Sequence, residues 1–383
     1  MFSIEIMTSI ASRFNPLFIF KKIEKTLILI LPIALITGPA IPDIIITILS
    51  IFFLFKKKFY NKIYEYKEVG FLFLFFISLI FTYLVKFDLI YLINTFIFLR
   101  FIFFILNVTD IFTNDEKLFD YFILIFLGIF FFQVLNVIFQ YIYHYDFFGF
   151  PAVYFEDINL YRLSGTFNDE LVVGSYFSKT LPIIILGLIF HCKINHLLSL
   201  FICLGVIIVI YFTGERAAFL SSILFFSLLG FVLFGFKFLL TLTFLSPIII
   251  LILYKLDFIL INNIYVYLKN FNSSSYFALF KSSILVANED IIFGNGHRSF
   301  ERLCDTLIEI DKNVDYDKCS THPHNYYLEI LTSYGLKSVF VFLIFYIYLL
   351  FGFFKTNVHI KSKILISGLL VIFFPIMTQL QYQ

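Results

Sequence analysis

The residues best suited to chemistry lie in one polar stretch, from Thr321 to Gly335. Within it, His324 and Asn325 follow Pro323, which favours the first turn of a helix because its missing N–H would be unbonded there. We therefore expect a helix that begins at Pro323, with its positive dipole end close to His324. Such a helix start can bind a phosphate, and a neutral imidazole beside it could take a proton from a sugar hydroxyl. The alternative is a histidine that lies at an interface without a chemical role.

A second stretch, 214–216, places an arginine next to an apolar run. The planar guanidinium of Arg216 suits bidentate contact with a phosphate, and it should face water, an anion or a partner because burying it in apolar surroundings is costly. A salt bridge with a loop carboxylate is the alternative. The run 162–170 could line a binding cleft, but its Asn168 and Asp169 are also good helix caps, and we expect capping.

These polar stretches interrupt a strongly apolar chain. Of its 383 residues, 61% are hydrophobic and 14% charged, against about 45–50% and 25% in a soluble domain. The apolar residues form repeated blocks close to the length of a membrane-spanning helix, which needs about 20 of them. The sequence thus predicts an all-α polytopic membrane protein with about eleven transmembrane helices, a twelfth also being compatible with the pattern. The predicted spans are 26–40, 41–55, 69–86, 88–108, 118–140, 171–190, 196–212, 217–235, 238–254, 336–354 and 364–380.

Lys and Arg in short connections indicate the cytoplasmic side of a membrane. Their distribution places the N-terminus inside, and leaves Lys86, Arg162 and Arg216 on the outside. We therefore divide the chain into N-terminal helices (1–140), central helices with an external segment at 141–170 (141–254), a large external loop with short helices (255–335) and C-terminal helices (336–383). Arg100 and Lys179 fall inside spans, and we expect each to be paired structurally within the helix bundle.

Two cysteines, Cys304 and Cys319, lie fifteen residues apart in the large external loop. A disulfide between them would stabilise the fold by about 3 kcal/mol in the chain-entropy model, and an oxidising periplasm would permit it. Two free thiols are the alternative. The net charge of +2 gives no reason to expect a nucleic-acid partner.

Three further patterns favour other chemistry only weakly. Residues 315–317 read Asp-Tyr-Asp, like the metal-nucleotide motif of soluble glycosyltransferases, but they fall on the outside, where nucleotide sugars are absent. His297, His322 and His324 lack the carboxylate or cysteine pattern of a typical zinc site, so we predict no metal. Gly294 to Gly296 is predicted to be a turn, because no phosphate-binding strand and helix surround it.

The spacing of these residues resembles the O-antigen ligase and O-antigen polymerase superfamily of bacterial envelope biogenesis. Its signature is His, then Asn, Ser or Gln, nine residues, Gly, two residues, and Gly, Thr or Tyr. Here the chain has His324, Asn325, nine residues and Gly335, with Ser338 at the last position. The resemblance extends over most of 150–380 through the runs 162–170, 214–216 and 293–296.

The resemblance implies a metal-independent glycosyltransferase of the bacterial inner membrane that needs no cofactor and whose site faces the periplasm. It would take a glycan from an undecaprenyl diphosphate carrier. A ligase passes the glycan to a lipid A-core acceptor, whereas a polymerase passes it to another carrier-linked glycan. We favour the ligase and keep the polymerase as the alternative. A lipid-glycan transporter is a third hypothesis, although transporters tend to carry charges near the membrane midplane and internal repeats. The family implies twelve spans.

The same resemblance assigns roles to residues of this chain. By analogy, His324 activates the acceptor hydroxyl, while Arg216 and a second arginine hold the diphosphate and stabilise the leaving charge. The candidates for the second arginine are Arg298 and Arg302, with Arg162 as a further candidate. Supporting roles are expected for Asn325, Glu215 and Gly335.

Overall fold

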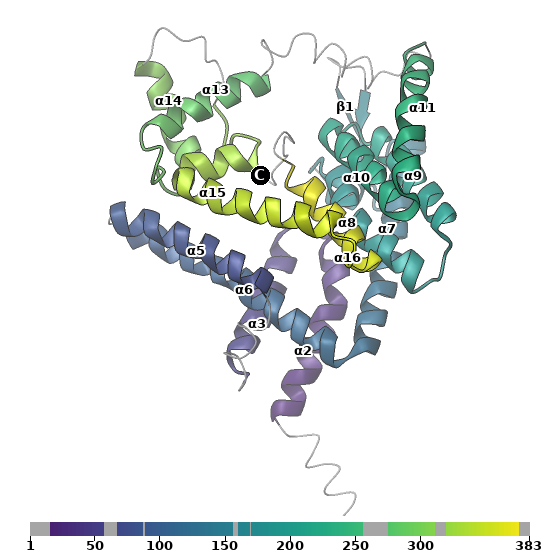
Figure 1. Ribbon diagram of the computed structural model, residues 1–383, viewed down its shortest axis with the longest axis horizontal. Helices are drawn as coiled ribbons and strands as arrows, with labels where there is room; N and C mark the ends of the chain where they lie inside the picture. Colours follow the sequence, from purple (N-terminus) through teal and green to yellow (C-terminus); the bar gives the residue numbers. More distant parts are fainter. Residues whose placement is uncertain are drawn as a thin grey trace, which may run out of the picture. The chain divides into compact units, whose positions relative to one another are not determined.

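The computed structural model describes residues 16–56, 67–86, 89–155, 160–168, 170–255, 275–310 and 319–374. These residues form thirteen α-helices and one short 3-10 helix, η2 (Gly165–Phe167). The helices, labelled in Figure 1, are α2 (Pro16–Ala34), α3 (Ala40–Leu54), α5 (Lys67–Lys86), α6 (Leu89–Asn114), α7 (Glu116–Tyr143), α8 (Val173–Phe190), α9 (His196–Phe212), α10 (Arg216–Phe234), α11 (Phe236–Lys255), α13 (Ser275–Asn288), α14 (Ser299–Ile310), α15 (Tyr326–Phe354) and α16 (Ile360–Ile372).

The helices confirm a polytopic membrane protein. Within the described residues, six helices are long and apolar enough to cross a membrane, and several shorter apolar helices accompany them. The predicted first span, 26–40, is wrong at both ends, because α2 already begins at Pro16 and a turn with Gly38 in the left-handed region separates it from α3. The last predicted span, 364–380, corresponds to α16, and its residues from 375 on lie outside the described part of the chain, as do residues 315–317.

The chain forms two compact units, which are described separately. The first unit comprises residues 1–76 and 93–129, and its core joins α2, α3, α6 and α7. In this unit Arg100 reaches Asp43 through two guanidinium nitrogens, at 2.9 and 2.6 Å, which confirms the predicted structural pairing. Lys25 pairs with Asp115, so two segments that the lysine distribution assigns to one side of the membrane do meet.

The second unit comprises residues 77–92 and 130–383. Helix α8 lies at its centre and packs against α9, α10 and α16, and most of its side chains are buried. A Cβ atom on Gly368 of α16 would lie 2.4 Å from Cγ of Pro182, so this glycine is what lets α16 approach the proline of α8. The candidate site described below is built entirely within this unit.

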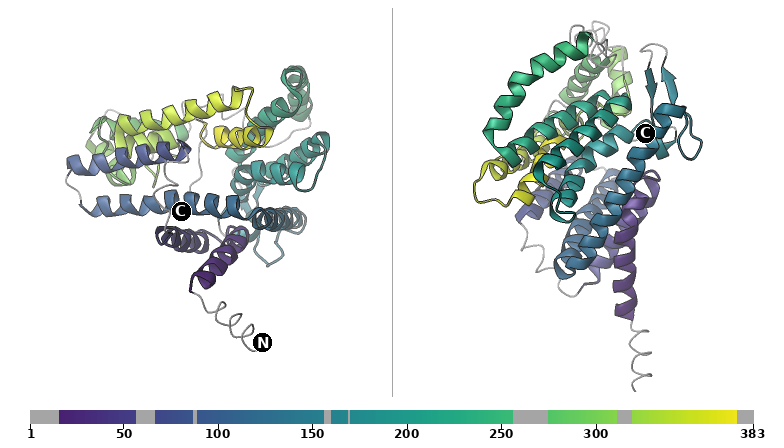
Figure 2. Two further views of the ribbon diagram at one scale, coloured as in Figure 1. Left: turned by 60° about the horizontal axis from the view of Figure 1, so that its bottom comes forward. Right: turned by 90° about the vertical axis from the view of Figure 1, so that its right-hand side faces the viewer.

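The segment after α7, which we predict to be external, contains a β-hairpin that the all-α prediction missed. Strands β1 (Val153–Phe155) and β2 (Leu160–Arg162) pair antiparallel, with Val153 opposite Arg162. The right-hand view of Figure 2 shows the hairpin beyond the end of α7. Two buried side chains of α7 hold the segment. Asn136 bonds Asp146, and Gln140 accepts the N–H groups of Ser164 and Gly165, so α7 continues as a scaffold for the polar run that follows it.

Candidate functional site

Helix α15 begins at Tyr326, immediately after His324 and Asn325 of the sequence motif. Asn325 is the N-cap, because its side-chain oxygen accepts the N–H groups of Tyr327 at 2.9 Å and Leu328 at 3.2 Å. The predicted helix start at Pro323 is therefore wrong by three residues. An Asn side chain satisfies exposed N–H groups better than a proline ring can, so the cap decides where the helix starts.

His324 is half-buried and is supported from behind by a second histidine. The centroids of the His322 and His324 rings are 4.2 Å apart, and His322 is buried, with its Nδ1 2.9 Å from the hydroxyl of Thr321. The backbone of His324 is in the left-handed region, with φ 54°. The ring is thus held in place by a buried neighbour and a strained turn while its outer face stays accessible.

Helix α15 reverses its direction at Gly335, where φ is 76° and ψ is 178°. Tyr327 and Phe342 are fifteen positions apart, which would separate them by about 22 Å in a straight helix. Their ring centroids are instead 5.3 Å apart. The hydroxyl of Tyr327 also donates to the carbonyl of Phe373, just after α16. The helix start that carries His324 therefore lies beside the middle of the second half of α15 and the end of α16.

A turn at Gly294 to Gly296 holds this reversal. A Cβ atom on Gly335 would lie 2.2 Å from the carbonyl oxygen of Ile292, and one on Gly294 would lie 2.4 Å from the backbone nitrogen of Tyr334. The N–H groups of Asn295 and Gly296 donate to the carbonyls of Thr332 and Ser333, at 2.8 and 2.9 Å. The predicted turn is confirmed, and its role, which the sequence did not reveal, is to bind the backbone of α15.

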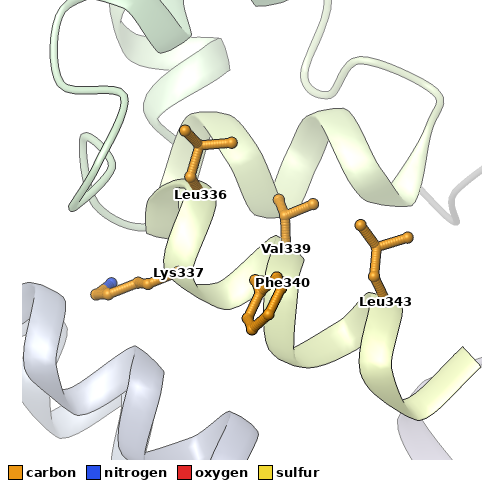
Figure 3. Close-up of a pocket in the computed structure, with 5 residues that line it drawn as sticks. All are labelled: Leu336, Lys337, Val339, Phe340 and Leu343. Carbon is orange, nitrogen blue, oxygen red and sulfur yellow. The ribbon is translucent and has the colours of Figure 1, made fainter. Parts of the chain in front are cut away.

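The end of α5 completes the support of the reversal. Thr82 of α5 donates to the carbonyl of Phe293, and Tyr83 accepts the N–H of His297. Lys337 donates to the hydroxyl of Thr82 at 2.6 Å, and Figure 3 shows it pointing toward the neighbouring helix. Further along α15, apolar side chains line a shallow groove of about 450 Å³ together with Lys337; they are Leu336, Val339, Phe340 and Leu343. No local signal in α5 pointed to these contacts.

A disulfide joins Cys304 of α14 to Cys319, three residues before His322, with 5.8 Å between the two Cα atoms. Cys304 is fully buried in the small apolar core between α13 and α14. The bridge therefore anchors the segment that leads to the histidine motif on a packed helix pair.

The two candidate loop arginines differ in their surroundings. Arg302 donates to the carbonyl of Asn295 at 2.7 Å, so it stabilises the turn that binds α15. The side chain of Arg298 is 72% exposed, and its guanidinium lies 3.9 Å from the carboxylate of Glu301. Both side chains are exposed, and they differ in that Arg302 is engaged by the backbone of the turn.

Arg216 is the first residue of α10. The residue before it, Glu215, has a structural role at the start of α8. The buried Glu215 carboxylate accepts the N–H of Gly174 at 2.5 Å, and the N–H and hydroxyl of Ser175 at 3.0 and 2.8 Å. It therefore caps α8 from outside that helix. Burial raises the pKa of the Glu215 carboxyl, against the opposing effects of these hydrogen bonds and of the charge of Arg162. The half-buried Arg216 has no side-chain hydrogen bond or ion pair with any residue that the structure describes.

A comparison with known protein families places most of these residues in one domain. The family model described as O-antigen ligase matches residues 198–345. The chain carries an O-antigen ligase domain. The match includes Arg216, both loop arginines, the glycine turn and the histidine motif with its reversal at Gly335. Neither the search of curated proteins nor the search of solved structures found a match.

The O-antigen ligase domain belongs to membrane enzymes of the O-antigen ligase and polymerase type, glycosyltransferases whose substrates are lipid-linked glycans. Within it, the structure brings His324, Asn325 and Gly335 together in one folded-back helix, with Arg302 on the turn that holds it. Arg216 lies at the start of α10, whose far end packs on the far end of α15 through Phe231 and Phe353, with ring centroids 5.8 Å apart. Among the described residues, no three His, Cys, Asp or Glu side chains come together as metal ligands do.

One prediction for residues that precede the O-antigen ligase domain is wrong. Asn168 does not cap α8, which begins five residues later with Val172 as its backbone N-cap, because Glu215 supplies the acceptor instead; Asp169 lies outside the described residues. The structural pairing of Lys179 of α8 stays a prediction: the charge of Glu215 acts on it, but no described residue forms a hydrogen bond or ion pair with it.

Replacing Glu215 with Ala is expected to lower the free energy of unfolding by about 2–4 kcal/mol, because one buried and two part-buried donors at the start of α8 lose their acceptor. Thermal unfolding in detergent measures the effect. Glu301→Ala is the control, since Glu301 forms an exposed pair with Arg298 and its loss should change stability by less than about 0.5 kcal/mol. Equal stability of the two variants would contradict the capping role.

Proposed function

We propose that the O-antigen ligase domain transfers a glycan from undecaprenyl diphosphate to a lipid A-core acceptor on the periplasmic face of a bacterial inner membrane. The observation that carries the proposal is His324, an accessible imidazole held at the start of a folded-back helix inside that domain. The O-antigen ligase domain supports a glycosyltransferase of the ligase or polymerase type. That the enzyme is a ligase rather than a polymerase is our proposal.

In the proposed reaction, His324 takes the proton of the acceptor hydroxyl as that oxygen attacks the anomeric carbon of the glycan. The bond from this carbon to the carrier breaks, and its electron pair leaves with the diphosphate. Arg216 stabilises the growing negative charge, with Arg298 as the second cation because Arg302 is bonded to the turn at Asn295. The proton on His324 then passes to solvent. Since His324 supplies the base and arginines the charge, the proposed reaction requires no metal and no cofactor.

An ion pair between two segments supports the proposal that the site lies on one side of the membrane. Lys86 at the end of α5 forms an ion pair with Asp290 at 3.0 Å, so two segments that we predict on the periplasmic side meet. The apolar groove on the second half of α15 offers a surface that suits the isoprenoid chain of the carrier.

The proposal is tested with the full-length protein in membranes, given a carrier-linked glycan with or without a lipid A-core acceptor. We expect undecaprenyl diphosphate to be released only with that acceptor, and release to continue in EDTA. Arg216→Ala should slow release by roughly 10²–10³-fold, as expected when a group that stabilises transition-state charge is removed. Arg216→Lys should retain part of the activity.

Two outcomes would replace this proposal. Longer carrier-linked chains formed without the lipid A-core would make the protein a polymerase. Movement of intact carrier-linked glycan across the membrane without any release would make it a transporter. Equal rates for wild type and Arg216→Ala would remove Arg216 from the site.

A further inference from the structure

Lys179 is a basic residue inside an apolar helix, and the described part of the chain gives it neither a hydrogen bond nor an ion pair. It lies in the second turn of α8, among side chains most of which are buried. A charged group within a membrane-spanning helix is costly and tends to be paired or to mark a functional site. Yet no described residue gives Lys179 a hydrogen bond or an ion pair.

The nearest candidate for pairing is already engaged. Glu215 interacts electrostatically with Lys179, but its two carboxylate oxygens accept three hydrogen bonds from Gly174 and Ser175. Arg162 also acts on the same carboxylate. The Glu215 carboxylate thus meets the charges of two cations, Lys179 and Arg162, while its oxygens are already bonded to the start of α8.

The position of Lys179 in α8 does not explain its presence. Side chains of a helix point toward its N-terminus, so the ammonium of Lys179 extends toward the level of Ser175 and Glu215. The positive end of the helix dipole lies there, and it disfavours a cation. Helix stability would be served better by an apolar residue at this position, and no described residue gives the lysine a hydrogen bond or an ion pair, so a bound anion would stabilise it.

We infer that Lys179 binds the diphosphate of the lipid carrier from inside the helix bundle, as a third cation beside Arg216 and Arg162. The inference rests on the proposed function, and it adds a binding residue that lies outside the O-antigen ligase domain at 198–345. Glu215 acts in this arrangement as a spacer that keeps α8 capped and the cations close together.

The test measures the affinity of the full-length protein in lipid nanodiscs for undecaprenyl diphosphate. Lys179→Met keeps the length of the side chain and removes its charge, and we expect it to weaken binding about 10-fold or more, as the loss of a charged hydrogen bond would. Lys179→Arg should bind within about 3-fold of wild type because the charge remains. The matched control is Lys237→Met, which removes an exposed lysine at the start of α11 and should leave affinity unchanged.

Two further measurements distinguish loss of diphosphate binding from loss of folded structure. One is the affinity for undecaprenol, which lacks phosphate, and the other is the thermal unfolding of each variant. If Lys179 serves the diphosphate, Lys179→Met binds undecaprenol like wild type, and its melting temperature is equal or higher. Equal affinity of wild type and Lys179→Met for undecaprenyl diphosphate would overturn the inference. A lower melting temperature of Lys179→Met, together with an equal loss of affinity for undecaprenol, would also overturn the inference. That result would indicate that Lys179 pairs structurally with Glu215. Wild type that binds the diphosphate but transfers no glycan would contradict the proposed function alone.

Discussion

Replacing His324 with Asn is expected to lower the rate of glycan transfer by roughly 10²–10⁴-fold, the range for loss of a general base. Asn is the sharper substitution because the backbone at this position has φ 54°, which Asn tolerates better than Ala. The half-buried ring can therefore be removed with little change in the turn. The rate of undecaprenyl diphosphate release from a lipid-linked glycan, measured with saturating acceptor, gives the effect.

Two controls separate chemistry from folding. His196→Asn changes an exposed histidine at the start of α9 and should leave both rate and stability unchanged. His322→Ala removes the buried ring behind His324 and should lower the melting temperature as well as the rate, since His322 is 5% exposed and bonded to Thr321. Transfer by His324→Asn within 3-fold of wild type would exclude His324 as the base.

Replacing Gly335 with Ala is expected to lower the free energy of unfolding by about 3 kcal/mol or more and to abolish transfer. A φ of 76° with a ψ of 178° is a conformation that essentially only glycine adopts, and forcing another residue into it costs about 1–3 kcal/mol. In addition, the new methyl group would lie 2.2 Å from the carbonyl oxygen of Ile292. The turn at 292–296 would have to move away from α15, and His324 would lose its position.

Gly352→Ala is the matched control for this variant, because it lies in the same helix. A Cβ atom there would meet only Ile366 Cδ1, at 3.4 Å, and the backbone is helical. We expect Gly352→Ala to be neutral or to stabilise the protein by up to about 1 kcal/mol. Thermal unfolding in detergent measures the stability of Gly335→Ala and Gly352→Ala. If Gly335→Ala were as stable and as active as Gly352→Ala, the reversal of α15 would not be needed for the fold or the site.

Hydropathy and the motif spacing gave a good account of the architecture before any coordinates. Each predicted span overlaps a helix, because blocks of apolar residues close to the width of a bilayer have few other stable forms in lipid. The family resemblance is confirmed by the O-antigen ligase match. The pairing of Arg100 was also predictable, since an arginine inside a span must find an anion.

Predictions of helix starts from local sequence were wrong where the capping acceptor was another residue than the one expected. Asn168 is a good cap by residue type, but Glu215 reaches α8 from 41 positions beyond Gly174 and takes that role. Pro323 favours a helix start, but the side chain of Asn325 sets it. In both cases the stronger acceptor determined the helix end, and propensity alone does not show which acceptor lies within reach.

The sequence by itself thus determined that this is a helical membrane protein with an O-antigen ligase domain, and it pointed to His324 and Arg216 as candidates. Only the tertiary structure decided that α15 folds back at Gly335, that the turn at 294–296 and Thr82 hold it there, and that no described residue forms a hydrogen bond or ion pair with Lys179. The reason is physical. Hydrophobic length and motif spacing are properties of neighbouring residues, whereas close backbone approach and charge balance depend on segments that meet only after folding.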